Sequence, residues 1–132
     1  MTCTEVDELD WVMLSFAPSS STQPGSRPAA LHAAASALAA SYLTRKDASK
    51  MLMVGAGALA PCLIRAHSAV RSFTEVIIWN HRSEKAEKLA DELTEEGIPA
   101  RAVTDIEGAT RDADLISCAT LSTEPLIRGD WL

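Results

Sequence analysis

Gly55 and Gly57 directly follow the apolar run Met-Leu-Met-Val at 51–54, and with Ala60 they form the pattern G-x-G-x-x-A. When such a turn joins a strand to a helix, its first glycine allows the tight bend and its second lets the main chain approach a pyrophosphate. The helix N-terminus adds free N–H groups and the positive end of its dipole. A glycine turn that binds no nucleotide is the alternative. We expect a dinucleotide to bind at five consecutive residues: Gly55, Ala56, Gly57, Ala58 and Leu59.

The segment after the next apolar run, 75–79, reads Asn80-His81-Arg82-Ser83 and carries no carboxylate. In NAD-binding domains an Asp or Glu at this place accepts hydrogen bonds from the ribose hydroxyls. A carboxylate would repel a 2′-phosphate, whereas a guanidinium can bind it bidentately. We therefore expect NADP(H) rather than NAD(H), with Arg82 as the main contact and Asn80, His81 and Ser83 assisting. The alternative is that His81 and Arg82 are exposed loop residues without a ligand.

A third polar segment, Thr120-Leu121-Ser122, lies in the stretch 118–125, after another apolar run. Ligands of open α/β sheets bind at the carboxyl ends of the strands, so Thr120 and Ser122 could donate hydrogen bonds to the nicotinamide half. A polar loop before a proline turn explains the same residues equally well. His32 and His67 lack partners at metal-ligand spacing, and we expect no metal site.

Composition narrows the class of protein. The 132 residues are enough for one domain, and 47% hydrophobic with 23% charged residues is the balance of a soluble globular protein. A net charge of −6 argues against a nucleic-acid or membrane surface. The cysteines, Cys3, Cys62 and Cys118, form no C-x-x-C pair, which indicates free thiols and a cytoplasmic location. We find neither a basic signal-peptide start nor an apolar run near the ~20 residues of a membrane span.

The segments that must position these residues alternate between helical and strand patterns. We expect helices at 29–46, 58–71, 84–96 and from Asp105 to Asp112, and strands at 51–54, 75–79, 100–103 and 114–120. This order predicts an α/β, Rossmann-type parallel sheet of about four strands with helices on both faces, preceded by an alanine-rich helix. The first strand should be central, flanked by the second and the fourth. Ser83 should cap its helix and Gly97 should end it.

The alanine-rich helix and the N-terminus carry further expectations. Leu31, Ala34, Leu38 and Tyr42 recur at helical spacing and form the apolar face of the first helix. Residues 17–28 are rich in Pro, Gly and Ser, and we expect residues 1–29 to be loop-like and disordered. A short strand at 11–17 is the alternative there, but it has no nearby partner. The strand at 114–120 should then be an open, aggregation-prone edge, and we expect marginal solubility.

Four stretches together resemble the ornithine cyclodeaminase/mu-crystallin family: "AAASALAASYL", "LMVGAGALAPCLIRAH", "EVIIWNHRSEKAEKLA" and "ADLISCATLSTEPLIRGDWL". The resemblance covers about 30–132 and implies a partial dinucleotide-binding domain. It also implies hydride transfer between NAD(P) and an amino or imino acid, as in pyrroline-2-carboxylate reduction, and a homodimer in the full-length family. An NAD-dependent ornithine cyclodeaminase and a non-catalytic nucleotide-binding fragment are the alternatives.

The resemblance also points to departures from the family. Relatives commonly have Arg-Thr, which helps to bind the substrate carboxylate, where this chain has Leu31-His32, and Arg where it has His81. The family's catalytic lysine and aspartate lie in segments that this chain does not match. We therefore expect a truncated member, and the sequence leaves open whether this chain alone is an enzyme.

Overall fold

The computed structural model describes residues 2–3, 13–15 and 27–132. Its elements, in chain order, are β1 (Thr2–Cys3), β2 (Met13–Ser15), α1 (Arg27–Leu43), β3 (Lys50–Val54), α2 (Ala60–Val70), β4 (Glu75–Trp79), α3 (Ser83–Glu95), β5 (Ala100–Val103), α4 (Ile106–Asp112), β6 (Leu115–Cys118) and the 3₁₀ helix η1 (Gly129–Trp131). Every helix and strand expected after residue 29 is present. The predicted disordered stretch includes residues 1, 4–12 and 16–26, which lie outside the described residues.

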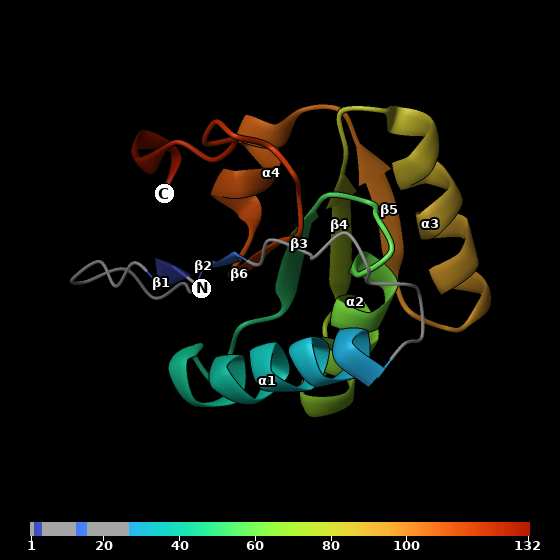
Figure 1. Cartoon of the computed structure of the whole chain (residues 1–132), viewed down its shortest axis with the longest axis vertical. Helices are drawn as coiled ribbons and strands as arrows, with labels where there is room; N and C mark the ends of the chain where they lie inside the picture. The colour runs from blue at the N-terminus through green and yellow to red at the C-terminus, as the bar shows by residue number, and fades with distance from the viewer. Residues whose placement is uncertain (1, 4–12, 16–26) are drawn as a thin grey trace.

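A single sheet with the strand order β1-β2-β6-β3-β4-β5 forms the centre of the molecule (Figure 1). Strands β3 to β6 are parallel, and β3 lies between β4 and β6, as the sequence predicts. The expected open edge at β6 is wrong: β2 pairs with it in parallel, from Met13 opposite Ile116 to Ser15 opposite Cys118, and β1 pairs antiparallel with β2. The polar groups of β6 therefore have a partner strand on each side.

Helices cover both faces of the sheet, in agreement with the predicted α/β class. Small and branched side chains of α2 and α3, such as Leu63 and Leu93, pack on one face against Met51, Met53 and Ile78. On the other face, α4 and residues 126–132 cover the side chains of Leu52, Ile77 and Ile116. The short β3 run is thus buried on both faces, which explains why it reads as continuous rather than alternating hydrophobicity.

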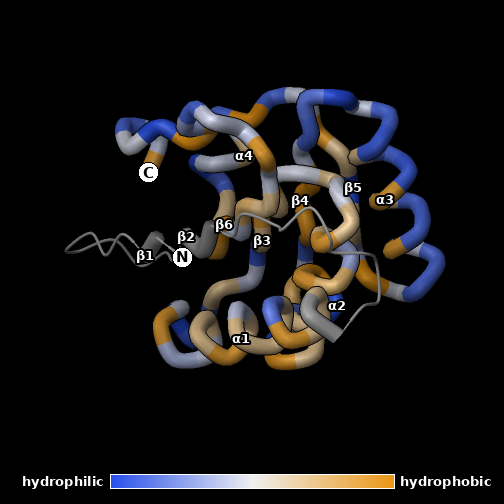
Figure 2. Tube along the Cα trace, in the orientation of Figure 1, coloured by the Kyte–Doolittle hydropathy of each residue, from blue (hydrophilic) through white to orange (hydrophobic). Residues whose placement is uncertain are grey.

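Helix α1 packs against α2 with its small side chains rather than with its large ones. Ala33, Ser36, Ala37 and Ala40 are buried, whereas the predicted apolar face lies outward, with Leu31 69%, Leu38 58% and Tyr42 82% exposed. Alanines let two helices approach closely, so the small side faces α2 and the larger residues point away from it. Figure 2 shows the contrast between the apolar α1 and the mostly hydrophilic α3.

Helix ends differ in how they are capped. Asp105 caps α4 as expected, because its Oδ1 accepts a hydrogen bond from Gly108 N at 3.1 Å. Gly97 has φ +87° just after α3, the left-handed conformation that ends helices. The prediction that Ser83 caps α3 is wrong: Ser83 is the first residue of that helix, and Arg82 takes the cap position without a side-chain hydrogen bond.

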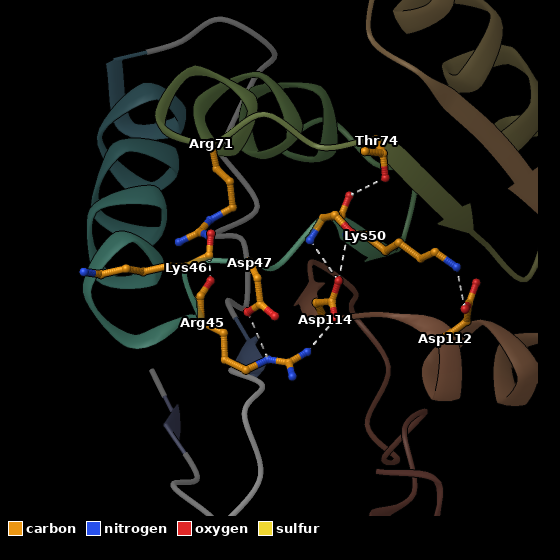
Figure 3. A network of polar contacts seen from close by, with 9 residues as sticks. Arg45, Lys46, Asp47, Lys50, Arg71, Thr74, Asp112 and Asp114 are labelled. Atoms are coloured by element: carbon orange, nitrogen blue, oxygen red, sulfur yellow. Dashed lines mark hydrogen bonds and ion pairs between the residues drawn. The ribbon is translucent and has the colours of Figure 1, made fainter.

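The amino-terminal edge of the sheet is held by the carboxylate of Asp114 (Figure 3). Its Oδ2 accepts hydrogen bonds from Ser49 N at 2.9 Å and Lys50 N at 3.0 Å, and its Oδ1 accepts one from Arg45 at 2.8 Å. Arg71 donates to the carbonyl oxygens of Arg45 and Lys46, which ties the end of α2 to the same loop. The cavity described below lies at the opposite end of the strands, among the loops that follow their carboxyl ends.

Candidate functional site

The glycine turn has two glycines with different tasks. Gly55 has φ +107°, and a Cβ on it would collide with the carbonyl oxygen of Ala119 and lie 3.1 Å from Cγ2 of Thr120. A Cβ on Gly57 would meet no atom within 4 Å. Gly55 therefore serves the fold, because it lets β3 and the loop after β6 lie in contact. Gly57 leaves main chain uncovered toward open space, as the close approach of a phosphate group requires.

A cavity of about 770 Å³ lies at the carboxyl ends of β3, β4 and β6, beside this turn. The three polar segments singled out in the sequence come together there, although they are far apart along the chain. Apart from Arg82 and Ser83, every expected site residue lines the cavity: Gly55, Ala56, Gly57, Ala58, Leu59, Asn80, His81, Thr120, Leu121 and Ser122.

Arg82 and Ser83 are the two expected residues that the structure does not bring to the cavity. Arg82 is exposed and is absent from the lining. Ser83 lines a separate hollow of about 350 Å³ with residues of β5 and with Asp105 and Glu87. Of the four residues after β4, Asn80 and His81 therefore line the cavity, whereas Arg82 and Ser83 do not.

Asn80 connects the two loops with both ends of its side-chain amide. Its Oδ1 accepts a hydrogen bond from Ala56 N at 3.2 Å, in the glycine turn, and its Nδ2 donates to the carbonyl oxygen of Arg82 at 3.0 Å. The same carbonyl accepts a hydrogen bond from Lys85 N at 3.1 Å. Asn80 thus fixes the glycine turn relative to the start of α3, and its amide is already used within the protein.

The hydroxyls after β6 also differ in what they can offer a ligand. Ser122 donates its hydroxyl proton to the carbonyl oxygen of Glu124 at 2.8 Å, so that proton is used inside the loop. Thr120 Oγ1 accepts a hydrogen bond from Ser122 N at 3.3 Å and keeps its own proton for another acceptor. Of the two hydroxyls expected to contact a nicotinamide ring, Thr120 is the one with a free donor.

Four residues line the cavity that the sequence reasoning did not single out: Trp79, Lys85, Ala119 and Leu126. Trp79 is the last residue of β4, and its Nε1 donates to the carbonyl oxygen of Thr104 at 3.1 Å, which fixes the ring. Lys85 is in the first turn of α3. The sequence could have indicated Lys85, because the first turn of a helix that follows a strand lies at the carboxyl end of that strand, where the cavity is.

Burial shifts the pKa values of two titratable side chains, Cys118 and His67, toward their neutral forms. Burial raises the pKa of the Cys118 thiol, at the end of β6, to about 12, so it is not a thiolate nucleophile. His67 is buried between α1 and α2, where its Nε2 lies 2.9 Å from Ser36 Oγ, and burial lowers its pKa to about 4. His67 therefore contributes to the packing of α2 on α1. The cavity itself offers main-chain N–H groups, hydroxyls and one lysine, which suit an extended anionic ligand.

Within the described part of the chain, no helix is long and apolar enough to cross a membrane. Nor do residues 2–3, 13–15 and 27–132 contain a group of three or more His, Cys, Asp or Glu side chains placed to hold a metal ion.

Comparison with known proteins gives a consistent result. The model of the ornithine cyclodeaminase/mu-crystallin family matches residues 28–132. The Δ1-pyrroline-2-carboxylate reductase of Paracoccus denitrificans is 42% identical over 103 residues, which cover 76% of this chain and 32% of that protein.

Two solved structures share the fold. The Thermococcus litoralis Δ1-pyrroline-2-carboxylate reductase, in complex with NADH and L-proline, superposes with a TM-score of 0.74 at 30% identity, over 78% of this chain and 32% of that one. The iminosuccinate reductase of Paracoccus denitrificans, in complex with NAD⁺, gives 0.67 at 38% identity, over 74% and 30%. This chain spans about a third of the length of the relatives it matches.

Proposed function

The chain belongs to the ornithine cyclodeaminase/mu-crystallin family, and we propose that it forms the family's dinucleotide-binding unit, with a nicotinamide coenzyme in the 770 Å³ cavity. The observation that carries the proposal is Gly57, whose missing Cβ leaves the turn open toward the cavity. The bound coenzymes named for the Thermococcus and Paracoccus structures support it.

The chain's own residues would bind and orient the coenzyme. The main-chain N–H groups of Gly57, Ala58 and Leu59 would bind its pyrophosphate, because those of Gly55 and Ala56 already donate to Trp79 and Asn80. Asn80 would hold that turn in place, and Thr120 would donate a hydrogen bond on the nicotinamide side. When bound, the coenzyme supplies the hydride chemistry. The absence of a carboxylate from 80–83 supports NADP(H) over NAD(H).

The activity we propose is that of an imino-acid reductase, in which a cyclic imino acid such as pyrroline-2-carboxylate is reduced to the amino acid. It rests on the reductases among the relatives and on the coenzyme cavity. The substrate site, a homodimer and a cytoplasmic location belong to the same proposal. The second candidate is a nucleotide-binding unit without catalysis. It is favoured by Leu31, which is 69% exposed where the family resemblance implies a carboxylate-binding arginine.

Coenzyme titration tests the proposal. Trp79 lines the cavity, so NADPH and NADH should each quench its fluorescence. For each coenzyme, the dissociation constant from calorimetry should agree with the one from the fluorescence titration. A Trp79→Phe variant should lose most of the quench but keep calorimetric binding if the fold is intact. Binding of neither coenzyme to the folded chain would refute the proposal. NADPH oxidation that depends on added pyrroline-2-carboxylate would separate the reductase from the non-catalytic unit.

A further inference from the structure

Most cations of the described chain already have partners. Among residues 29–132, each arginine and lysine side chain makes an ion pair or hydrogen bond, except for Lys46, Arg82 and Lys85. Lys46 lies at the amino-terminal edge of the sheet and points away from the Asp114 network (Figure 3). The other two follow β4, close to the carboxyl-terminal edge.

Only one of these two cations reaches the cavity. Both side chains are exposed, but Lys85 lines the cavity beside Asn80 and His81, whereas Arg82 lies outside the lining. The carbonyl oxygen of Arg82 accepts hydrogen bonds from Asn80 Nδ2 and Lys85 N, at 3.0 and 3.1 Å. These bonds fix the main chain at Arg82 and place the first turn of α3 next to the residue that holds the glycine turn.

The neighbouring carboxylates do not neutralise Lys85. Glu84 is exposed and Glu87 lines the separate 350 Å³ hollow, and neither forms an ion pair with Lys85. Lys85 is the only lysine or arginine among the described residues that line the cavity. An unpaired ammonium at the edge of a cavity whose described lining holds no carboxylate attracts a phosphate monoester more than a ribose hydroxyl.

We propose that Lys85, and not Arg82, selects NADPH over NADH by pairing with the 2′-phosphate. The inference rests on the proposed coenzyme function and assigns its specificity to one side chain. It departs from the sequence expectation, in which the guanidinium of Arg82 is the main contact. A lysine acts here as a point charge and needs no bidentate geometry, so its position on a helix turn suffices.

Matched variants test the assignment in the full chain. Lys85→Met and Arg82→Met remove each charge and keep an apolar stem, and Lys88→Met is the control on the same helix, where Lys88 pairs with Glu92 at 3.9 Å. Calorimetry with NADPH and NADH, and with adenosine 2′,5′-bisphosphate and 5′-AMP, gives affinities without any turnover. Circular dichroism melts check that each variant folds.

We expect Lys85→Met to weaken NADPH and the bisphosphate on the order of 10- to 100-fold, and NADH and 5′-AMP less than about threefold. Lys85→Arg should keep the preference, and Arg82→Met and Lys88→Met should change it less than about threefold. A loss specific to NADPH at Arg82→Met, or equal losses for both coenzymes at Lys85→Met, would overturn the assignment to Lys85 but not the proposed coenzyme function. The assignment would also fail if Lys85→Met changed neither affinity. Failure of the unaltered chain to bind any of the four ligands would instead refute the coenzyme function, and this inference with it.

Discussion

At the scale of single residues, the two glycines of the turn differ in whether the fold needs them. Gly55 combines a positive φ with close contact to the main chain of Ala119, whereas Gly57 has neither constraint. Residue type and spacing identified both positions in the sequence. They could not tell which glycine the fold needs, because that depends on the approach of a loop more than sixty residues away, at Ala119.

Alanine at each glycine should reveal the difference. Gly57→Ala should change the free energy of unfolding by less than about 1 kcal/mol and weaken NADPH and NADH alike, by at least about tenfold, because the new methyl group occupies the phosphate approach. Gly55→Ala should destabilise the chain by about 2 kcal/mol or more through strain and collision. Urea unfolding and calorimetry measure the two effects. A Gly57→Ala chain that bound both coenzymes normally would contradict the role of Gly57.

Lys85 marks the limit of prediction from residue types. A basic residue after β4 was expected to contact the ligand, and the sequence offers Arg82 at the expected place. The choice between the two depends on the direction in which the chain leaves the strand. That direction is set by the hydrogen bonds of Asn80, which no local pattern specifies.

At the scale of elements, α1 (Arg27–Leu43) begins two residues before and ends three residues before the expected 29–46, and its large apolar side chains face outward. Its neighbouring residues Ala37 and Leu38 are 2% and 58% exposed. Periodicity identified the helix and a stripe of large apolar side chains, but it did not show which side of the helix faces the protein. The close packing of α1 on α2 requires small side chains, and a single helix pattern does not contain that requirement.

Substitutions at this neighbouring pair test the packing. Ala37→Leu should destabilise the chain by about 1–3 kcal/mol, because the added methyl groups force α1 away from α2. Leu38→Gln should change the free energy of unfolding by less than about 0.5 kcal/mol, because its side chain is already largely in water. Urea denaturation of both variants is the measurement. A larger loss at Leu38 than at Ala37 would reverse the orientation described for the helix.

His67 makes the α1–α2 pairing sensitive to acid. Its ordinary pKa is 6.5 and burial lowers it to about 4 in the folded chain, so between these values the unfolded chain binds a proton that the folded chain does not. Stability should therefore fall as the pH is lowered from 6.5 to 4, by at most about 3 kcal/mol. His67→Gln should flatten unfolding curves measured across this range. A slope unchanged in the variant would assign the effect to another group.

At the scale of the whole molecule, the order of the parallel strands followed from the alternation of strands and helices, and the site followed from that order. The pairing at the β6 side of the sheet did not follow from that alternation. β2 pairs with β6 across about a hundred residues of chain, from Met13 to Ile116, and three residues of strand carry too little pattern to predict such a partner. The expectation of an open edge failed for this reason.

Among the residues at the amino-terminal ends of the strands, Asp114 should make the largest contribution to the free energy of unfolding. Burial opposes its ionisation, but the N–H groups of Ser49 and Lys50 together with Arg45 hold its pKa below the ordinary 3.8. Its contribution is therefore present above pH 3.8 and is lost as the pH falls through the lower, folded-state pKa.

Asp114→Asn should destabilise the chain by about 1–3 kcal/mol at pH 7, because two half-buried N–H groups lose their charged acceptor. It should also flatten the acid limb below pH 3.8. Asp112→Asn is the control, since Asp112 pairs with Lys50 in a half-exposed ion pair, and it should have little effect. Thermal melts across pH measure both variants, and coenzyme affinity should be unchanged in each. Equal destabilisation by the two variants would contradict the role given to Asp114.

The hydrogen bonds of Asn80 have a kinetic consequence. Because protein contacts alone hold the glycine turn against the start of α3, a dinucleotide can dock without first rebuilding either loop. Arrival of the two coenzymes should then be equally fast, and discrimination between them should reside in how long each one stays.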